Sequence, residues 1–158
     1  GFSVWPKTIF GHAEKLAVNC HSCVNAPTQF AGLAALDGPQ DAVKDMVKAF
    51  DDRRRVIVGE LNQIPGFRCV EPGGAFYAFP NIEGTGLGAK ALQTKLLEEA
   101  GVAVIAGTSF GAYGEGYLRF SYANSTENIV AAIDRIGAML AAGPAAAPRW
   151  PCAGKGWG

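Results

Sequence analysis

Residues 116–129 have the sequence GYLRFSYANSTENI, which passes from a strand pattern to a helix pattern near its midpoint. Successive side chains of a strand point to opposite faces. Arg119 therefore shares one face with Ser121, whereas the apolar Leu118 and Phe120 take the other. This alternation predicts a strand with one buried apolar face and a guanidinium group on the opposite face.

The second half of this stretch predicts the start of the last helix. Asn124 is expected at the N-cap position and Glu127 at the third helical position, where polar side chains satisfy free backbone N–H groups. The predicted helix spans 125–142, and its apolar residues recur at the spacing of one helical face. They are Ile129, Ala132, Ile133, Ile136 and Leu140.

Outward from this stretch, the periodicity of the apolar residues predicts the remaining elements. Helices are expected over 6–19, 26–36, 40–63 and 89–100, and strands over 67–70, 75–79, 102–106 and 117–122. The first two strands flank Glu71-Pro72-Gly73-Gly74, which favours a hairpin. This order of elements gives the fold class α+β (of the α/β type), with a small mixed β-sheet covered by helices. Residues 143–158 have no periodicity and are expected to form an irregular tail.

Composition and charge limit the classes of function. The chain has 14 Lys plus Arg and 14 Asp plus Glu, so its net charge is zero and no nucleic-acid-binding surface is indicated. No apolar run approaches the roughly 20 residues that span a bilayer. Four cysteines are too few for a disulfide scaffold at this length, which favours a cytoplasmic protein. The chain begins at Gly1 without a signal-peptide pattern, so we expect a fragment or a processed piece.

One short motif suggests a hydrolase. Gly107-Thr108-Ser109-Phe110-Gly111 fits the nucleophile motif of α/β-hydrolases, which needs a helix directly after the serine and a histidine later in the chain. Both histidines, His12 and His21, precede Ser109. A serine hydrolase that uses Ser109 is therefore an unfavoured alternative.

Two further motifs are weak for chemical reasons. Cys20 and Cys23 have C-x-x-C spacing, but a zinc site needs a second ligand pair, and Cys69 and Cys152 do not form one in the sequence. The loop over 84–88, GTGLG, lacks the lysine of a phosphate-binding loop. We therefore expect no metal site and interpret the loop as a surface loop.

Arg119 is the strongest candidate for a binding residue. A glycine-rich segment, residues 107–116, comes just before its strand. A guanidinium group on a rigid strand beside an open loop offers two parallel N–H donors to a carboxylate. The competing interpretation is an arginine exposed at the edge of a sheet, and the residue pattern alone does not separate the two.

Five segments, taken in order, resemble a single family. They are TQFAGLAALDGPQDAV (28–43), AFDDRRRVIVGELNQIPG (49–66), PGGAFYAFP (72–80), LLEEAGVAVIAGTSFG (96–111) and GEGYLRFSYANSTENI (114–129). Together they resemble the C-terminal third of class I (fold type I) pyridoxal-phosphate-dependent aminotransferases, close to the aspartate aminotransferase group. The resemblance covers residues 1 to about 142.

The resemblance implies a division of the chain and an activity. Residues 1–39 would be a helical segment from the end of the large domain. Residues 40–142 would be the long interdomain helix and the small C-terminal domain, followed by the tail over 143–158. The implied activity is transfer of an amino group between an amino acid and a 2-oxo acid by a cytoplasmic homodimer, with pyridoxal 5'-phosphate as the cofactor.

The resemblance also assigns roles to individual residues. Arg119 takes the position that binds the substrate α-carboxylate, and Phe110 and Phe76 fall near the substrate pocket. Asn19 and Ser22 fall in a segment that approaches the active site of the partner subunit.

The catalytic residues of the family have no counterpart in this sequence. In the family pattern, the Schiff-base lysine and the groups that hold the phosphate and the ring of the cofactor fall upstream of Gly1. The chain is therefore expected to be inactive alone and to bind pyridoxal phosphate without a covalent link, if at all. The alternative is a stand-alone module that binds a small molecule through Arg119 without catalysis.

Overall fold

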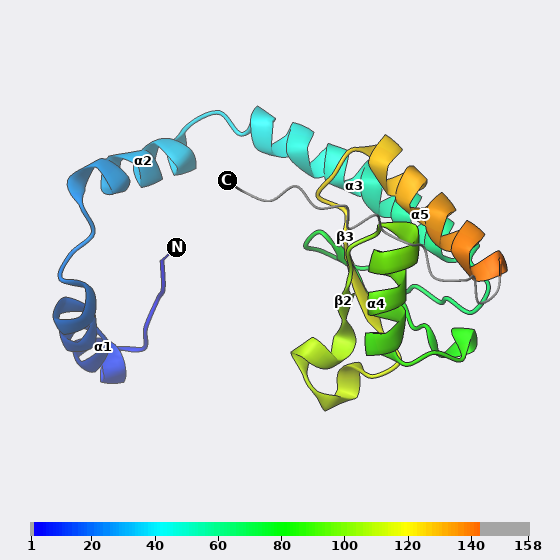
Figure 1. The fold of residues 1–158 in the computed structure, drawn as a ribbon. Coiled ribbons are helices and arrows are strands. Elements are labelled where there is room, and N and C mark those ends of the chain that lie inside the picture. Colours follow the sequence, from blue (N-terminus) through cyan, green and yellow to red (C-terminus); the bar gives the residue numbers. More distant parts are fainter. Residues whose placement is uncertain (1, 143–158) are drawn as a thin grey trace, which may run out of the picture. The chain divides into compact units, whose positions relative to one another are not determined.

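The computed structural model describes residues 2–142, and these residues form five α-helices and three short strands (Figure 1). The chain divides into two compact units, residues 1–44 and residues 45–158. The tail predicted over 143–158 lies outside the described residues.

The first unit contains two helices without a core of their own. α1 (Lys7–His21) follows Pro6, and α2 (Ala26–Asp37) follows Asn25, whose side chain accepts a 2.9 Å hydrogen bond from the backbone N–H of Thr28. Neither helix contains a buried residue. The exposed large apolar side chains of this unit are Phe2, Val4, Trp5, Ile9, Phe10, Leu16, Val18, Val24, Phe30, Leu33, Leu36 and Val43.

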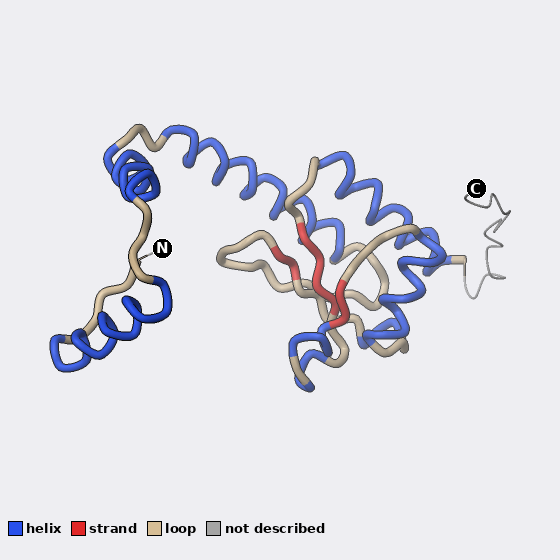
Figure 2. The backbone as a smooth tube through the Cα atoms, turned by 60° about the vertical axis from the view of Figure 1, so that its left-hand side comes forward, coloured by secondary structure: helices blue, strands red, loops and turns tan. Residues whose placement is uncertain are grey.

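The second unit has one hydrophobic core, to which three helices contribute. α3 (Asp41–Leu61) begins in the first unit and buries its last turns in the second. α4 (Ala89–Ala100) packs against α5 (Thr126–Ala141), and both lie beside the strands in Figure 2. The helical residues of the core are Ile57, Leu61, Ala89, Leu92, Leu96, Ile129, Ile133, Ile136 and Met139.

A small antiparallel sheet lies against these helices. β1 (Tyr77–Ala78), β2 (Ile105–Ala106) and β3 (Leu118–Ser121) are arranged in the order β1-β3-β2. The α+β class is confirmed, although both strand pairs are antiparallel where a mixed sheet was expected. Leu118 and Phe120 are buried, as the alternation predicts, because their side chains face the core.

The hairpin predicted over residues 67–79 does not form. Arg68 pairs with Asn81 in an isolated bridge instead, and residues 67–70 form no strand. The side chain of Asn62, just after α3, bonds both backbone groups of Cys69, accepting from its N–H at 2.8 Å and donating to its carbonyl at 3.0 Å. A backbone satisfied in this way has no hydrogen-bonding groups left for a strand ladder at that position.

The helix boundaries follow their local capping signals. α4 begins and ends where the sequence predicts, and Gly101 ends it in the left-handed conformation, with φ of 65°. α5 differs at its start, because Ser125 rather than Asn124 is the N-cap: its hydroxyl accepts a 3.2 Å hydrogen bond from the N–H of Asn128. Glu127 is therefore the second helical residue, one position earlier than predicted.

Candidate functional site

The candidate site is built around Arg119, in the central strand of the sheet. β3 pairs with β1 on one side and with β2 on the other. Because its neighbours Leu118 and Phe120 face the core, Arg119 points to the opposite face, where it is half-buried. Paired strands on both sides hold the backbone of this residue, so its side chain leaves the sheet from a fixed position.

Tyr77 covers the guanidinium group from the β1 side. Tyr77 pairs with Ser121, two residues beyond Arg119, so Tyr77 and Arg119 are diagonal neighbours on one face of the sheet. The Cζ atom of Arg119 lies 4.4 Å from the centroid of the Tyr77 ring. This distance is that of a cation–π contact.

Phe110 makes a second contact of the same kind from the β2 side. It ends the 3₁₀ turn η2 (Gly107–Phe110), which follows β2 directly. The Cζ atom of Arg119 lies 4.4 Å from the centroid of the Phe110 ring as well. Two aromatic rings, one from β1 and one from the turn after β2, therefore contact one cation.

Further aromatic side chains support these two rings. Phe79 meets Phe110 edge-on at 6.4 Å between ring centroids and stacks on Tyr117 at 5.3 Å. On the other side, Phe76 lies 4.5 Å from Tyr77, centroid to centroid. Both rings that contact Arg119 are thus held by neighbours and not only by their own backbone.

Two glycines allow the backbone of the segment around Phe110 to come into close contact with itself. Gly107 donates a 2.8 Å backbone hydrogen bond to the carbonyl of Tyr117. A Cβ atom on Gly107 would overlap the carbonyl of Gly114, and a Cβ atom on Gly114 would overlap the carbonyl of Gly107. The glycine-rich segment seen in the sequence therefore permits a close approach of two backbones and fixes the position of the Phe110 ring.

The donors of Arg119 are not used within the described part of the chain. Within residues 2–142, Arg119 forms no ion pair and no side-chain hydrogen bond. Arg54 on α3 is different, because it contacts Asp51 at 2.5 Å, Glu71 at 2.6 Å and the carbonyl of Pro72 at 3.1 Å. The hydrogen bond from Arg54 lowers the pKa of the Asp51 carboxyl group. Arg119 therefore remains the better candidate for binding an external anion.

The other residues that sequence reasoning assigned to the site lie elsewhere. Phe76 is 39% exposed and lines a cavity of about 560 Å³ with residues of α3, among them Met46 and Phe50. Asn19 and Ser22 belong to the first unit. Asn19 donates to the carbonyl of Lys15 within α1, and Ser22 ends that helix with φ of 61°. In the structure, Phe110 thus contacts Arg119, whereas Phe76 contacts the ring of Tyr77, the next residue in the chain.

Tyr77 is the residue that the sequence reasoning missed. The resemblance of PGGAFYAFP to a family motif points to its neighbour Phe76, and the motif does not tell which aromatic side chain contacts the arginine. The register between β1 and β3 decides this question. A signal in the sequence was the alternation itself, which separates Tyr77 from Phe76 onto opposite faces of a strand.

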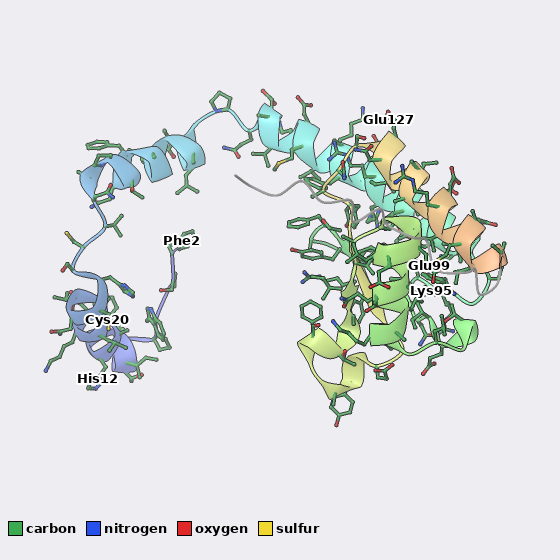
Figure 3. The ribbon with its side chains drawn as sticks, viewed as in Figure 1. Phe2, His12, Cys20, Lys95, Glu99 and Glu127 are labelled. Atoms are coloured by element: carbon green, nitrogen blue, oxygen red, sulfur yellow. The ribbon has the colours of Figure 1, made fainter. Side chains whose placement is uncertain are left out.

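The remaining motifs form no catalytic or metal site within the part of the chain that the structure describes. Ser109 lies in η2 and is followed by a second 3₁₀ turn, η3 (Ala112–Gly114), so the helix that a hydrolase elbow requires is not formed. Cys20 and His12 both lie on α1 (Figure 3), and Cys20 and Cys23 are exposed. Among the described residues, no group of three His, Cys, Asp or Glu side chains is arranged to hold a metal ion. No helix within residues 2–142 is long and apolar enough to cross a membrane.

The lysines of residues 2–142 bear on where pyridoxal phosphate could be attached. Their lysines lie on α1, α3 and α4, and none lies on the strands or turns that surround Arg119. Lys95 on α4 lies beside Glu99, with 3.8 Å between Nζ and Oε2 (Figure 3). Within residues 2–142, no lysine therefore lies on β3 or on the elements that carry Tyr77 and Phe110.

The chain has clear relatives among known proteins. The family model for aminotransferase class I and II matches residues 1–136. The aspartate aminotransferase of Pyrococcus horikoshii is 43% identical over 142 residues, which cover 89% of this chain and 36% of that protein. The aspartate aminotransferase of Geobacillus stearothermophilus is 39% identical over 147 residues, covering 90% of this chain and 37% of that protein.

Solved structures show the same relationship. An aromatic aminotransferase from Pyrococcus horikoshii superposes with a TM-score of 0.81 at 37% identity, over 87% of this chain and 37% of that one. An alanine aminotransferase from Pyrococcus furiosus superposes with a TM-score of 0.77 at 35% identity, over 84% of this chain and 34% of that one. The chain spans just over a third of the length of the curated relatives it matches. The resemblance seen in the sequence is confirmed, and the chain belongs to the class I and II aminotransferase family.

Proposed function

We propose that this chain is the C-terminal part of an enzyme that transfers an amino group between an amino acid and a 2-oxo acid, and that Arg119 binds the α-carboxylate of the substrate. One observation carries the proposal. The guanidinium group of Arg119 lies against two aromatic rings and has no ion-pair partner within residues 2–142. A cation held in place without a partner of its own is suited to an anionic ligand.

The chemistry of the guanidinium group favours a carboxylate as that ligand. Its planar edge carries N–H donors that match the two oxygens of a carboxylate and form two parallel, charge-assisted hydrogen bonds. Every α-amino acid and every 2-oxo acid carries such a carboxylate, so one arginine serves both substrates of the exchange. The printed names of the relatives include aspartate, aromatic and alanine aminotransferases, which supports the class of substrate rather than one amino acid.

The rest of the enzyme is part of the proposal. We propose that the complete enzyme uses pyridoxal phosphate, held by residues outside this chain, and that the chain alone is inactive. The complete enzyme would be a cytoplasmic homodimer in which Asn19 and Ser22 approach the active site of the partner subunit. Phe110 and Phe76 would form part of the wall around the substrate.

Two measurements test the proposal. The complete enzyme, with cofactor, should move ¹⁵N from a labelled amino acid to an unlabelled 2-oxo acid, and failure with a broad panel of amino acids would refute the assigned activity. The chain alone should be treated with pyridoxal phosphate and borohydride and then mapped by peptide mass spectrometry. Stoichiometric labelling of one lysine would contradict the proposal that the cofactor lysine lies outside the chain.

A further inference from the structure

We infer that Tyr77 is a positioning residue for Arg119: its ring and the ring of Phe110 hold the guanidinium group between them, so that only the edge of the group is open to a ligand. The sequence alone does not single out Tyr77. Its meaning for substrate binding rests on the proposed function. The rings of Tyr77 and Phe110 form a clamp around the guanidinium group of Arg119, and the geometry of this clamp is independent of that function.

The order of the strands places the two rings on opposite sides of Arg119. Tyr77 comes from β1 and Phe110 from the turn after β2, and β3 lies between these two strands. Each ring centroid is 4.4 Å from the Cζ atom of Arg119. Within residues 2–142, Tyr77 and Phe110 form no aromatic pair with each other. The guanidinium group therefore separates the two rings.

A clamp of this kind changes how the arginine binds. The free arginine side chain has several rotatable bonds, and fixing it on a ligand costs conformational entropy. Rings on both faces fix these bonds before a ligand arrives, which removes part of that cost. They also leave the N–H edge as the accessible part of the group, and this edge is the part that binds a carboxylate with two hydrogen bonds.

Tyr77 is the more firmly held of the two rings. Its backbone is paired with β3, it is half-buried, and its ring lies 4.5 Å from Phe76, centroid to centroid. Phe110 ends a short turn and is 54% exposed. We therefore assign the fixed wall of the clamp to Tyr77 and the outer wall to Phe110.

The clamp is tested on the chain itself with phenylglyoxal, a reagent that modifies arginine side chains. Peptide mass spectrometry gives the rate at each arginine, and the exposed Arg135 on α5 is the internal reference. In the unmodified sequence, Arg119 should react more slowly than Arg135. Tyr77→Ile, which keeps a residue suited to a strand, should accelerate the reaction of Arg119 several-fold. Tyr77→Phe, which keeps the ring, should leave the rate unchanged.

Three outcomes would overturn the clamp. They are equal rates at Arg119 and Arg135 in the unmodified sequence, no acceleration in Tyr77→Ile, and the same acceleration in Tyr77→Phe as in Tyr77→Ile. The first of these needs no variant, so the clamp remains testable even where Tyr77→Ile fails to fold. Phe76→Leu is a matched control for the loss of a neighbouring ring, and it should accelerate the reaction of Arg119 less than Tyr77→Ile does.

A second measurement connects the clamp to the substrate. In the complete enzyme, Tyr77→Ile should raise KM for amino acids about two- to thirtyfold, the range of a cation–π contact, with little change in kcat. In Tyr77→Phe, which keeps the ring, KM should equal that of the unmodified enzyme. Faster modification of Arg119 together with an unchanged KM would leave the clamp standing and would refute its contribution to substrate binding, whereas the role of Arg119 as the carboxylate anchor is refuted by an unchanged kcat/KM in Arg119→Ala. The two ideas therefore fail in different measurements.

Discussion

Two arginines of the second unit show how the same type of side chain serves two different purposes. Arg54 lies on α3, and its N–H donors bind Asp51, Glu71 and the carbonyl of Pro72 within the chain. Arg119 lies on β3 and contacts the rings of Tyr77 and Phe110, which accept no strong hydrogen bonds. Both side chains are held, but within residues 2–142 only Arg54 uses its N–H donors in hydrogen bonds and ion pairs.

The partners of an arginine indicate its role better than its exposure does. Both side chains are half-buried. Carboxylates around Arg54 neutralise it and connect α3 to the turn after Cys69, which is a structural task. Aromatic rings around Arg119 orient the cation without neutralising it, which suits binding. Substitutions of Arg54 and of Arg119 should therefore have different effects.

The largest expected effect is on activity in Arg119→Ala, measured in the complete enzyme. Removing one side of a charged pair in a partly buried site costs about 2–5 kcal/mol. The value of kcat/KM for amino acids should therefore fall by about two to three orders of magnitude or more. Stability should change little, because Arg119 forms no ion pair within residues 2–142. The measurement is steady-state kinetics together with urea unfolding.

Two controls sharpen this test. Arg54→Ala should show the opposite pattern: the free energy of unfolding should fall, and kcat/KM should change little. For amines that lack an α-carboxylate, kcat/KM should be the same in Arg119→Ala as in the unmodified enzyme. Equal losses for such amines and for true amino acids would show that Arg119 has a structural role and that the carboxylate anchor lies elsewhere.

The sequence predicted the elements of this site better than their contacts. α4 was predicted residue by residue because its signals are local: apolar residues at helical spacing and Gly101 at its end. The face of Arg119 followed from the alternation around it. Tyr77 could not be assigned in this way, because its contact with Arg119 depends on the register between β1 and β3. The hairpin over 67–79 does not form because a residue outside the predicted hairpin intervenes: the side chain of Asn62 satisfies the backbone of Cys69.

A smaller effect is expected from Gly114→Ala, which alters the turn under Phe110. The added Cβ atom would overlap the backbone of Gly107, so the turn has to open. Overpacking of this kind costs about 1–3 kcal/mol of unfolding free energy. Urea unfolding measures the loss, and arginine modification should show a faster reaction at Arg119 because the outer ring is displaced.

Gly137→Ala is the matched control for this substitution. Gly137 lies within α5, and nothing lies within 4 Å of a Cβ atom placed there. Alanine in a helix interior is more stable than glycine by roughly 0.5–1 kcal/mol, so this variant should gain stability. A Gly114→Ala variant as stable as the unmodified chain would contradict the close approach of the two glycine backbones.

The smallest expected effect is a pH dependence that belongs to Arg54 and not to Arg119. The hydrogen bond from Arg54 is the main reason that the pKa of Asp51 in the folded chain lies below its ordinary value of 3.8. A carboxyl group with a lowered pKa stabilises the fold above its unfolded pKa, and this contribution is lost as the pH falls through the folded pKa. The difference in unfolding free energy between the unmodified chain and Arg54→Ala should therefore be largest above about pH 5 and shrink toward pH 2. Part of the pH dependence of Asp51 should survive in the variant, because Arg55 also contacts Asp51, at 2.8 Å.

The same difference taken for Arg119→Ala should stay constant over this range, because Arg119 is paired with no carboxylate within residues 2–142. Urea unfolding at a series of pH values measures both differences. A difference for Arg119→Ala that shrinks with falling pH as the one for Arg54→Ala does would show that Arg119 is ion-paired within the chain, and the distinction between the two arginines would be lost.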